Sequence, residues 1–461
     1  MSSQSSSALA VILACSLAAC GGGGGGGSPA PSPTNRAPTL TPSSTTVTVA
    51  ENSTGTLFTL SASDPDGDPV NLSLTGADAA FFTLGAGGAV TFTAAPNYDR
   101  FADDDSDNDY VVVAQASDGR GGTVRRTLTV TVANQREGFR VTRIASGFVE
   151  PAGMSLLFGR TLLVAERAGQ IHSVDGRDGT TTDYRTVALP AGGAVLDIAS
   201  ETLGASPFFP VVLFSEPAGM SLRFNINEGS TQDVRVATGA PEGAAGKIAY
   251  NFRADFDQGE VLVAVGDPTG NRVGGASGYG NLSSVSRPEA SQSSTVRVIG
   301  RGVRQPGGWI SQQGFIPFFA DQGGSVAHEL NSIETSPPAS FGWPFLEGTT
   351  RLMAGGPSAT VSPSFIYEFG NGALQGLGIV AGVISLGNGV PGLDGDFVFG
   401  DLNGTIWTLD RNFGVSSFEN RSADFIPDVG EIGEVVKIII DDADAIYILD
   451  ADGELFRVDA A

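Results

Sequence analysis

The segment Leu162–Asp175, LLVAERAGQIHSVD, consists of an apolar run, an acidic turn containing glycine, and a second apolar run that ends in aspartate. The same order recurs at Phe397–Asp410 and at Ala445–Asp459, and a weaker copy begins at Val212–Gly219. Each copy predicts a β-hairpin, because short apolar runs separated by glycine-containing turns are typical of paired strands. Hairpins recurring over about 320 residues, at roughly 50 residues for each four-stranded blade, predict a β-propeller of about six blades over residues 139–461.

Residues 39–135 carry a second, shorter strand pattern. Apolar and polar residues alternate in Thr46–Val49, Val70–Leu74 and Leu128–Val132, and Tyr110–Ala114 is a short apolar run. About a hundred residues of such runs, separated by turn-forming residues, predict a β-sandwich. Helical signals are scarce, because the chain holds 64 glycines and 25 prolines and its apolar runs are short. We therefore expect an all-β protein in which a β-sandwich precedes a six-bladed β-propeller.

The charge of the chain restricts its partners. The 461 residues carry a formal net charge of −24. Nucleic acids bind basic surfaces, so no nucleic-acid partner is expected. Cations and neutral ligands fit this charge better, and a protein partner is left unidentified.

The N-terminus combines an apolar run, Ala8–Leu17, with the small residues and cysteine of Ala18-Ala19-Cys20. The run is too short to cross a bilayer and indicates an export signal. The pattern resembles a bacterial lipobox, which implies a signal peptide over residues 1–19, acylation of Cys20, and anchoring to a lipid bilayer of the bacterial cell envelope, facing the periplasm or the exterior. The alternatives are an ordinary cleaved signal peptide or a misassigned start, because residues 1–7 contain no lysine or arginine.

Residues 20–38 predict a linker, first flexible and rich in glycine, then stiffened by proline, that spans roughly 20–25 Å. Cys15 would leave with the signal peptide, so Cys20 would be the only remaining cysteine and no internal disulfide could form.

Four motifs of the sandwich region follow one another in a fixed order: Ala50–Asn52, Ala62–Gly67, Asn97–Arg100 and Ala114–Gly119. They resemble a cadherin-like repeat. The resemblance implies calcium at both ends of the domain, with Asp64, Asp66 and Asp118 at one end and Glu51 and Asp99 at the other. The alternative is a set of solvated acidic turns, because Ala133–Arg136 replaces the acidic terminal motif of the family. The run Asp103–Asp109 is also dense in carboxylates and is either a cation-binding loop or a solvated one.

Seven motifs of residues 139–461 also keep a fixed order: Glu166–Ile171, Val261–Asp267, Gly302–Pro306, Ala320–Gly323, Glu329–Asn331, Phe341–Pro344 with Glu347-Gly348, and Pro391–Asp401. Together they resemble the soluble quinoprotein glucose, sorbosone and aldose sugar dehydrogenases. The resemblance implies a propeller that binds pyrroloquinoline quinone and calcium on its axis and oxidises sugars.

The chain departs from this family at the general base. Members carry a histidine, followed by Asn-Gly-Gly and a basic residue, where this chain has Gly243–Lys247. His172 lies in a repeated hairpin, where aromatic residues stand in the other copies, and is expected to be structural. His328 is a second-choice site residue. A general base contributes about 10²–10⁴-fold, so its loss predicts very slow catalysis or none.

The resemblance also implies a cofactor site built from separate blades. Lys247 and Arg304 would face the anionic quinone, whereas Asp267 and Glu329 offer oxygen ligands to calcium. A later arginine of the family is missing, because Gly378–Gly382 occupies its place. Solvated turns and a structural ion pair are the alternatives for these residues. Since inner strands of a propeller converge on its channel, we expect any residual site on the axis.

The sequence therefore predicts an envelope-anchored, quinoprotein sugar dehydrogenase-like protein with an eroded active site and weak or absent sugar oxidation. The alternative is a non-catalytic, calcium-dependent adhesin or receptor that binds glycans or proteins. A purely structural envelope protein is a third class.

Overall fold

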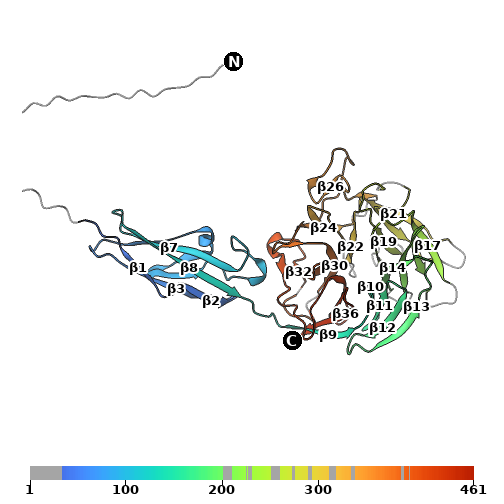
Figure 1. Cartoon of the computed structure of the whole chain (residues 1–461), viewed down its shortest axis with the longest axis horizontal. Helices are drawn as coiled ribbons and strands as arrows, with labels where there is room; N and C mark the ends of the chain where they lie inside the picture. Colours follow the sequence, from blue (N-terminus) through green and yellow to red (C-terminus); the bar gives the residue numbers. More distant parts are fainter. Residues whose placement is uncertain are drawn as a thin grey trace, which may run out of the picture.

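The computed structural model describes residues 34–461 except 201–209, 225, 227–230, 251–259, 273–275, 289–292, 311–317, 334–337, 386–388 and 394. The predicted signal peptide, Cys20 and most of the linker lie outside the described residues. The regular structure described is β-strand with four short 3₁₀ helices, and no described helix has the length and hydropathy of a membrane span. A sandwich and a propeller form two bodies joined by the segment between β8 and β9 (Figure 1).

The sandwich consists of two four-stranded sheets. One has the order β1 (Thr39–Pro42), β3 (Thr56–Ser63), β6 (Ala89–Phe92), β5 (Phe82–Leu84), and the other β2 (Thr46–Ala50), β8 (Thr123–Ala133), β7 (Asp109–Ser117), β4 (Asn71–Thr75). Three 3₁₀ helices connect them: η1 (Ala77–Phe81), η2 (Ala86–Gly88) and η3 (Tyr98–Arg100). Along β8, Leu128, Val130 and Val132 are buried and alternate with more exposed residues, which confirms the predicted two-residue period.

The propeller contains six blades among the described residues, as predicted. The first blade consists of β10 (Pro151–Phe158), β11 (Thr161–Glu166), β12 (Gln170–Asp175) and β13 (Thr181–Thr186). The second consists of β14 (Ala194–Ala199), β15 (Val211–Glu216), β16 (Gly219–Phe224) and β17 (Gln232–Thr238). The third consists of β18 (Gly246–Tyr250), β19 (Val261–Val265), β20 (Asn281–Val285) and β21 (Val296–Arg301), with β25 (Ala339–Ser340) added at its edge.

The fourth blade is β22 (Pro306–Ile310), β23 (Phe318–Asp321), β24 (Ala327–Ser332), β28 (Phe365–Phe369) with β29 (Gln375–Gly376), and it carries the hairpin β26 (Leu346–Glu347) and β27 (Thr350–Arg351). The fifth is β30 (Ile379–Ile384), β31 (Phe397–Asp401), β32 (Ile406–Leu409), β33 (Glu419–Asn420), with η4 (Val415–Ser417) before β33. The sixth is β34 (Val435–Ile440), β35 (Ile446–Asp450), β36 (Glu454–Ala460) and β9 (Phe139–Ser146).

The ring closes through strands from both ends of the propeller sequence. β9 pairs antiparallel with β36, so the first strand of the region completes the last blade. The innermost strands β10, β14, β18, β22, β30 and β34 contact one another in order, and β34 contacts β10. No edge is left open between the first and last blades, which explains how the fold is held without disulfides.

The repeated hairpins correspond to β11–β12, β31–β32 and β35–β36. Their shared glycines Gly169, Gly404 and Gly453 all have positive φ, the backbone region that glycine favours. A Cβ at Gly453 would lie 2.0 Å from the carbonyl oxygen of Phe148. Close approach of the neighbouring chain therefore adds to the requirement for glycine in this turn.

Candidate functional site

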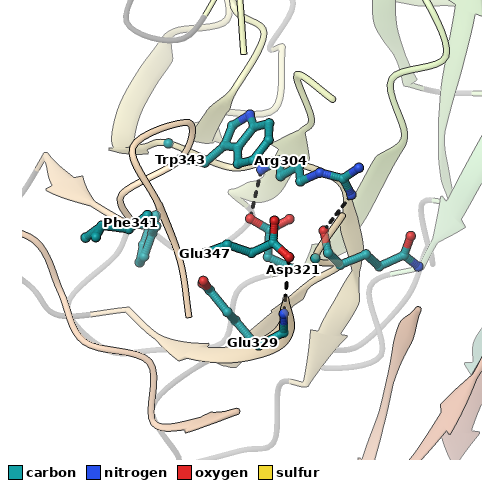
Figure 2. Close-up of a pocket in the computed structure, with 11 residues that line it drawn as sticks. Arg304, Asp321, Glu329, Phe341, Trp343 and Glu347 are labelled. Carbon is teal, nitrogen blue, oxygen red and sulfur yellow. Dashed lines mark hydrogen bonds between the residues drawn. The ribbon is translucent and has the colours of Figure 1, made fainter. Parts of the chain in front are cut away.

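A small pocket in the fourth blade contains two of the predicted site residues. Arg304 lies between β21 and β22, and Glu329 lies on β24. Asp321, Trp343 and Glu347 also line the pocket, so its lining contains three carboxyl groups and one guanidinium group (Figure 2). Sequence motifs contained these three residues, but no site role was predicted for them.

The Arg304 side chain is held in place by its neighbours. Its Nη1 donates to the Gln322 carbonyl oxygen at 2.9 Å, and the guanidinium carbon lies 5.3 Å from the centre of the Trp343 ring. Asp321 accepts from the backbone N–H groups of Arg304 and Gln305 at 2.8 and 2.6 Å. Burial raises the pKa of Asp321 to about 6 although these hydrogen bonds oppose the shift. The site is therefore rigid, and it is acidic rather than cationic.

Glu329 is a buried carboxyl group with two local hydrogen-bond partners. Its Oε2 accepts from Asn331 Nδ2 at 3.0 Å and its Oε1 accepts from the Gly348 N–H at 2.5 Å. Burial, with the nearby Asp321 charge as a further cause, raises the pKa of Glu329 to about 8. At pH 7 and in the absence of a cation, Glu329 therefore carries a proton.

Glu347 organises the loop beside this pocket. Its Oε1 accepts from four consecutive backbone N–H groups, those of residues 324–327, at 2.5–3.1 Å. Burial alone would raise its pKa, but these hydrogen bonds hold the pKa of Glu347 below its usual value. A glycine-rich loop in the sequence indicates backbone N–H groups that need an acceptor. The loop does not indicate which residue supplies that acceptor.

Asp267 and Lys247 do not line this pocket. Asp267 is fully buried and accepts from Thr269 Oγ1 and from the Arg272 N–H, while its carbonyl oxygen accepts from Trp343 Nε1 at 2.7 Å. The Asp267 carboxylate therefore stabilises the turn formed by residues 267–272. Lys247 lies on the inner strand β18, where burial lowers the pKa of its ammonium group. The structure thus brings Arg304 and Glu329 together, places Asp267 next to them through Trp343, and leaves Lys247 apart.

An ion pair between inner strands occupies part of the channel. Lys437 Nζ on β34 lies 3.2 and 3.0 Å from the two carboxylate oxygens of Asp197 on β14. Asp197 is fully buried and also acts electrostatically on Lys247. Gly153 of the intervening strand β10 makes room for the pair, because a Cβ there would lie 2.4 Å from Asp197 Oδ1. Neither Asp197 nor Lys437 was predicted as a site residue.

Both histidines of the chain have structural partners. His328 is fully buried; its Nδ1 accepts from the Gly323 N–H at 3.1 Å and its Nε2 donates to the Gly376 carbonyl oxygen at 2.9 Å. Burial lowers the pKa of His328, so it is neutral. His172 contacts Glu166 and Asp183 on the first blade. Neither ring lines the Arg304 pocket.

The backbone at the aligned base position favours glycine. Gly243 has φ +78° and the preceding Glu242 has φ +50°. Gln305 holds this loop from both sides, since its Nε2 donates to the Gly243 carbonyl oxygen and its Oε1 accepts from the Ala245 N–H, each at 3.1 Å. The missing histidine is therefore accompanied by a backbone conformation that disfavours a side chain.

A second acidic site lies where the sandwich meets the propeller. Glu51 and Asp99, both predicted calcium ligands, are joined by Glu137, and one oxygen from each lies within 4.8 Å of the others. Neither carboxylate oxygen of the fully buried Asp99 accepts a hydrogen bond from the described residues. Burial, with the neighbouring charge of Asp424 as a further cause, raises the pKa of Asp99 to about 8.

Arg421 of the propeller is the principal cation at this junction. It is 3% exposed, and its Nε lies 2.9 Å from Asp424 and 3.4 Å from Asp99. It also forms ion pairs with Glu137 and Glu419. With Glu51, five carboxyl groups therefore surround one buried guanidinium group. The residues fit a divalent cation, because hard oxygen ligands are in excess and Asp99 lacks any hydrogen-bond donor.

The opposite end of the sandwich has a different arrangement. Asp66 accepts from Arg36 Nε at 2.8 Å, Asp118 accepts from Asn35 Nδ2 at 2.7 Å, and Asp64 accepts from the Asp66 N–H at 2.7 Å. These three aspartates are not among the three-carboxylate groups found in the described residues. Arg36 and Asn35 of the segment preceding β1 thus pair with Asp66 and Asp118, whereas Asp64 Oδ2 has no hydrogen-bond partner among the described residues, and calcium binding at this end stays a prediction.

The acidic run at Asp103–Asp109 does contain such a group. Oxygens of Asp103, Asp105 and Asp107 lie within 4.8 Å of one another, with Asp103 buried and the other two exposed. A hydrogen bond with Asp103 raises the pKa of Asp105. An exposed acidic loop of this kind is stable without an ion, so its role stays a prediction.

Comparisons with known proteins agree with the two-domain fold. Residues 35–131 match the family model described as Bacterial Ig domain. The propeller resembles the PQQ-bound aldose sugar dehydrogenase of Streptomyces coelicolor, with a TM-score of 0.50 at 18% identity over 70% of this chain and 98% of that one. It also resembles a glucose dehydrogenase, with a TM-score of 0.53 at 18% identity over 70% and 99%, and the apo-form of the Escherichia coli aldose sugar dehydrogenase, with 0.50 at 14% over 70% and 100%. No curated protein sequence matches the chain. The propeller thus has the fold of the soluble sugar dehydrogenases, and a bacterial Ig-type sandwich precedes it.

Proposed function

We propose that this is an envelope-anchored protein whose quinoprotein-dehydrogenase-like propeller oxidises sugars weakly or not at all. The absence of an imidazole base carries the proposal. Gly243 stands at the aligned base position in a left-handed conformation, while His172 and His328 are engaged elsewhere. Without an imidazole to accept the proton of the sugar hydroxyl, hydride abstraction loses its usual partner.

The charges around the expected cofactor site support the same conclusion. Pyrroloquinoline quinone is a tricarboxylate, so its binding requires several accessible cations. Lys437 is paired with Asp197, and Arg304 shares its pocket with the carboxyl groups of Asp321, Glu329 and Glu347. Arg351, on β27, is exposed and donates to the Met353 and Gly355 carbonyl oxygens. Lys247 alone is a weak counter-charge for three carboxylates, and the residues present do not fit the quinone well.

The proposal is tested by supplying everything that an active dehydrogenase needs. Purified protein is incubated with pyrroloquinoline quinone, calcium, a dye acceptor and a panel of aldoses, beside an active aldose sugar dehydrogenase. We expect dye reduction at least about 10²-fold slower than in the active enzyme. Trp343, which stacks near Arg304, provides a separate fluorescence readout of cofactor binding. Turnover comparable to that of the active enzyme would overturn the proposal.

A Gly243→His variant tests whether the missing histidine base is the only reason for the low dehydrogenase activity that we expect. Because φ at Gly243 is +78° and the cations are scarce, we expect no more than a slight gain in dye reduction. A gain of two or more orders of magnitude would show instead that the rest of the site is intact.

A second function, calcium-dependent binding by a non-catalytic receptor or adhesin, is favoured by the orphaned Asp99 carboxylate at the domain junction. Calcium ligated there by Glu51, Asp99 and Glu137 would fix the sandwich relative to the propeller. We expect calcium to raise the melting temperature of the full chain, because a ligand that binds only the native state stabilises it by mass action. Glu51→Gln should abolish this increase, whereas Asp64→Asn, at the opposite end, should preserve it. An unchanged melting temperature in calcium would rule the junction site out.

A further inference from the structure

A cleft of about 290 Å³ lies between the second and third blades, outside the channel. Its walls come from β17 on one blade and from β20 and β21 on the other. It shares no lining residue with the Arg304 pocket, and no residue of it belongs to the cofactor or calcium sites discussed above. Its volume is close to the lower end of the range for small-molecule sites, about 300–1,000 Å³.

Two arginines, Arg235 and Arg301, line the cleft, and Arg301 is the last residue of β21. The part of the chain that the structure describes offers its guanidinium no ion pair or side-chain hydrogen bond, although the whole protein carries a net charge of −24. Arg235 on the opposite wall is already paired with Glu216. An arginine left without a carboxylate in so acidic a protein favours an anionic ligand, and its planar fork suits a carboxylate in particular.

The floor of the cleft is polar and lacks partners. Asn281 is 3% exposed and its Oδ1 accepts no hydrogen bond from the described residues. The buried Ser277 Oγ likewise has no partner among them. Buried polar groups are nearly always hydrogen-bonded, so these atoms point to a ligand that supplies the missing bonds. An amide oxygen only accepts, hence the ligand must bring a hydroxyl or amine donor.

Apolar atoms complete the cleft. Val236 and Val298 line it beside the polar floor. A ligand with one C–H face, several hydroxyl groups and one carboxylate meets all three requirements. Sulfate satisfies Arg301 but brings no donor for Asn281, and a neutral hexose satisfies Asn281 but leaves Arg301 unpaired.

We propose that this inter-blade cleft binds a uronic acid, a sugar ring that carries a carboxylate, either free or as a unit of an acidic glycan. The carboxylate pairs with the Arg301 guanidinium. Ring hydroxyl groups donate to Asn281 Oδ1 and bond with Ser277 Oγ, and the C–H face of the ring packs on Val236.

The test titrates the full chain with D-glucuronate and D-galacturonate, with D-glucose and acetate as comparators, by isothermal calorimetry and saturation-transfer NMR. We expect saturable binding of a uronate at least about tenfold tighter than that of glucose or acetate. If acetate binds with the same affinity as the uronate, the cleft is a general anion site and the uronic-acid proposal is wrong. The absence of uronate binding at millimolar concentration would also refute the proposal. Both outcomes are independent of the dye-reduction assay, because the cleft lies outside the channel.

Variants locate the binding. Arg301→Gln should weaken uronate binding by about tenfold or more while leaving glucose binding unchanged. Arg297→Gln is the matched control, because Arg297 lies on the same strand but its guanidinium contacts Glu260, away from the cleft. Should Arg301→Gln fold poorly by its melting curve, Ser277→Ala removes one floor partner and is expected to weaken uronate binding about threefold. Unchanged affinity in a folded Arg301→Gln or Ser277→Ala protein would overturn the assignment.

Discussion

At the scale of single residues, the lack of a side chain at Gly153 determines which groups lie in the propeller channel. Gly153 leaves the space that the Asp197–Lys437 ion pair fills. We expect Gly153→Ala to lower the free energy of unfolding by about 1–3 kcal/mol, because the new Cβ overpacks a buried ion pair. Denaturant unfolding measures the change. Gly414→Ala, whose added Cβ would come no closer than 3.4 Å to its neighbours, is the control and should change little.

Asp99 gives a prediction about pH. Its pKa of about 8 in the folded protein lies well above the ordinary value of 3.8, so the folded state retains this proton while the unfolded state loses it. The stability due to the protonated group is full below about pH 4 and is lost as the pH rises toward 8. In chelator, Asp99→Asn should therefore flatten this decline and be more stable than the wild type at pH 8 by at least about 1 kcal/mol. Melting temperatures across pH 5–8 test this, with the exposed Asp104→Asn as control; parallel curves for Asp99→Asn and wild type would contradict it.

The motifs correctly predicted only that certain residues lie together, and what these residues bind stays a prediction. Arg304 and Glu329 were predicted to share a pocket, and Glu51 and Asp99 to share a cluster, because family motifs placed them. Glu137, Asp197 and Arg421 belong to no motif, and each forms at least one ion pair with a residue distant in sequence. Their roles depend on which strands meet in three dimensions, which spacing along the chain does not reveal. The expected meeting of Lys247 with Arg304 in one pocket did not occur, because the register of β18 places Lys247 near the Asp197–Lys437 pair.

At the scale of elements, the repeated hairpins made the propeller predictable from the sequence, because each contains a full pair of strands and a turn that requires glycine. The additions to the fourth blade were not predicted, since the strands β26 and β27 are two residues each and leave no periodic pattern. These additions bring Trp343 and Glu347 to the pocket. An addition to the four-stranded blade thus shapes the candidate site, as is common for loops on a rigid scaffold.

Glu347 should be the main support of this added element. Glu347→Gln replaces a charged acceptor of four N–H groups with a neutral one, and charged acceptors form hydrogen bonds roughly twice as strong. We expect a loss of about 1–3 kcal/mol in unfolding free energy and a changed Trp343 emission, because residues 324–327 lose their anchor. The exposed Glu368→Gln on β28 serves as control. An unaltered spectrum and stability would mean that the loop holds its shape without Glu347.

At the scale of the whole molecule, the proposed anchor is the property most easily tested. Cys20→Ala should release the protein from membranes into the soluble fraction, because acyl chains contribute about 0.8 kcal/mol for each buried CH₂ group and the chain has no other predicted membrane attachment. Fractionation with and without detergent measures the release. Palmitate labelling of wild type but not of the variant is the accompanying control, and a variant that stays in the membrane fraction would contradict lipid anchoring.

The closure of the ring through β9 has a mechanical consequence. If the chain is tethered at its N-terminus, tension on a bound propeller passes through the sandwich into Phe139, the first residue of β9. β9 is paired along seven positions with β36, so the load pulls the strand along its own axis and shears these pairs together instead of peeling them one by one. The Arg421 ion pairs lie just before that strand and would break first. The junction would then separate at a lower force than the force that opens the ring. Calcium bound at the junction would determine the force at which it separates.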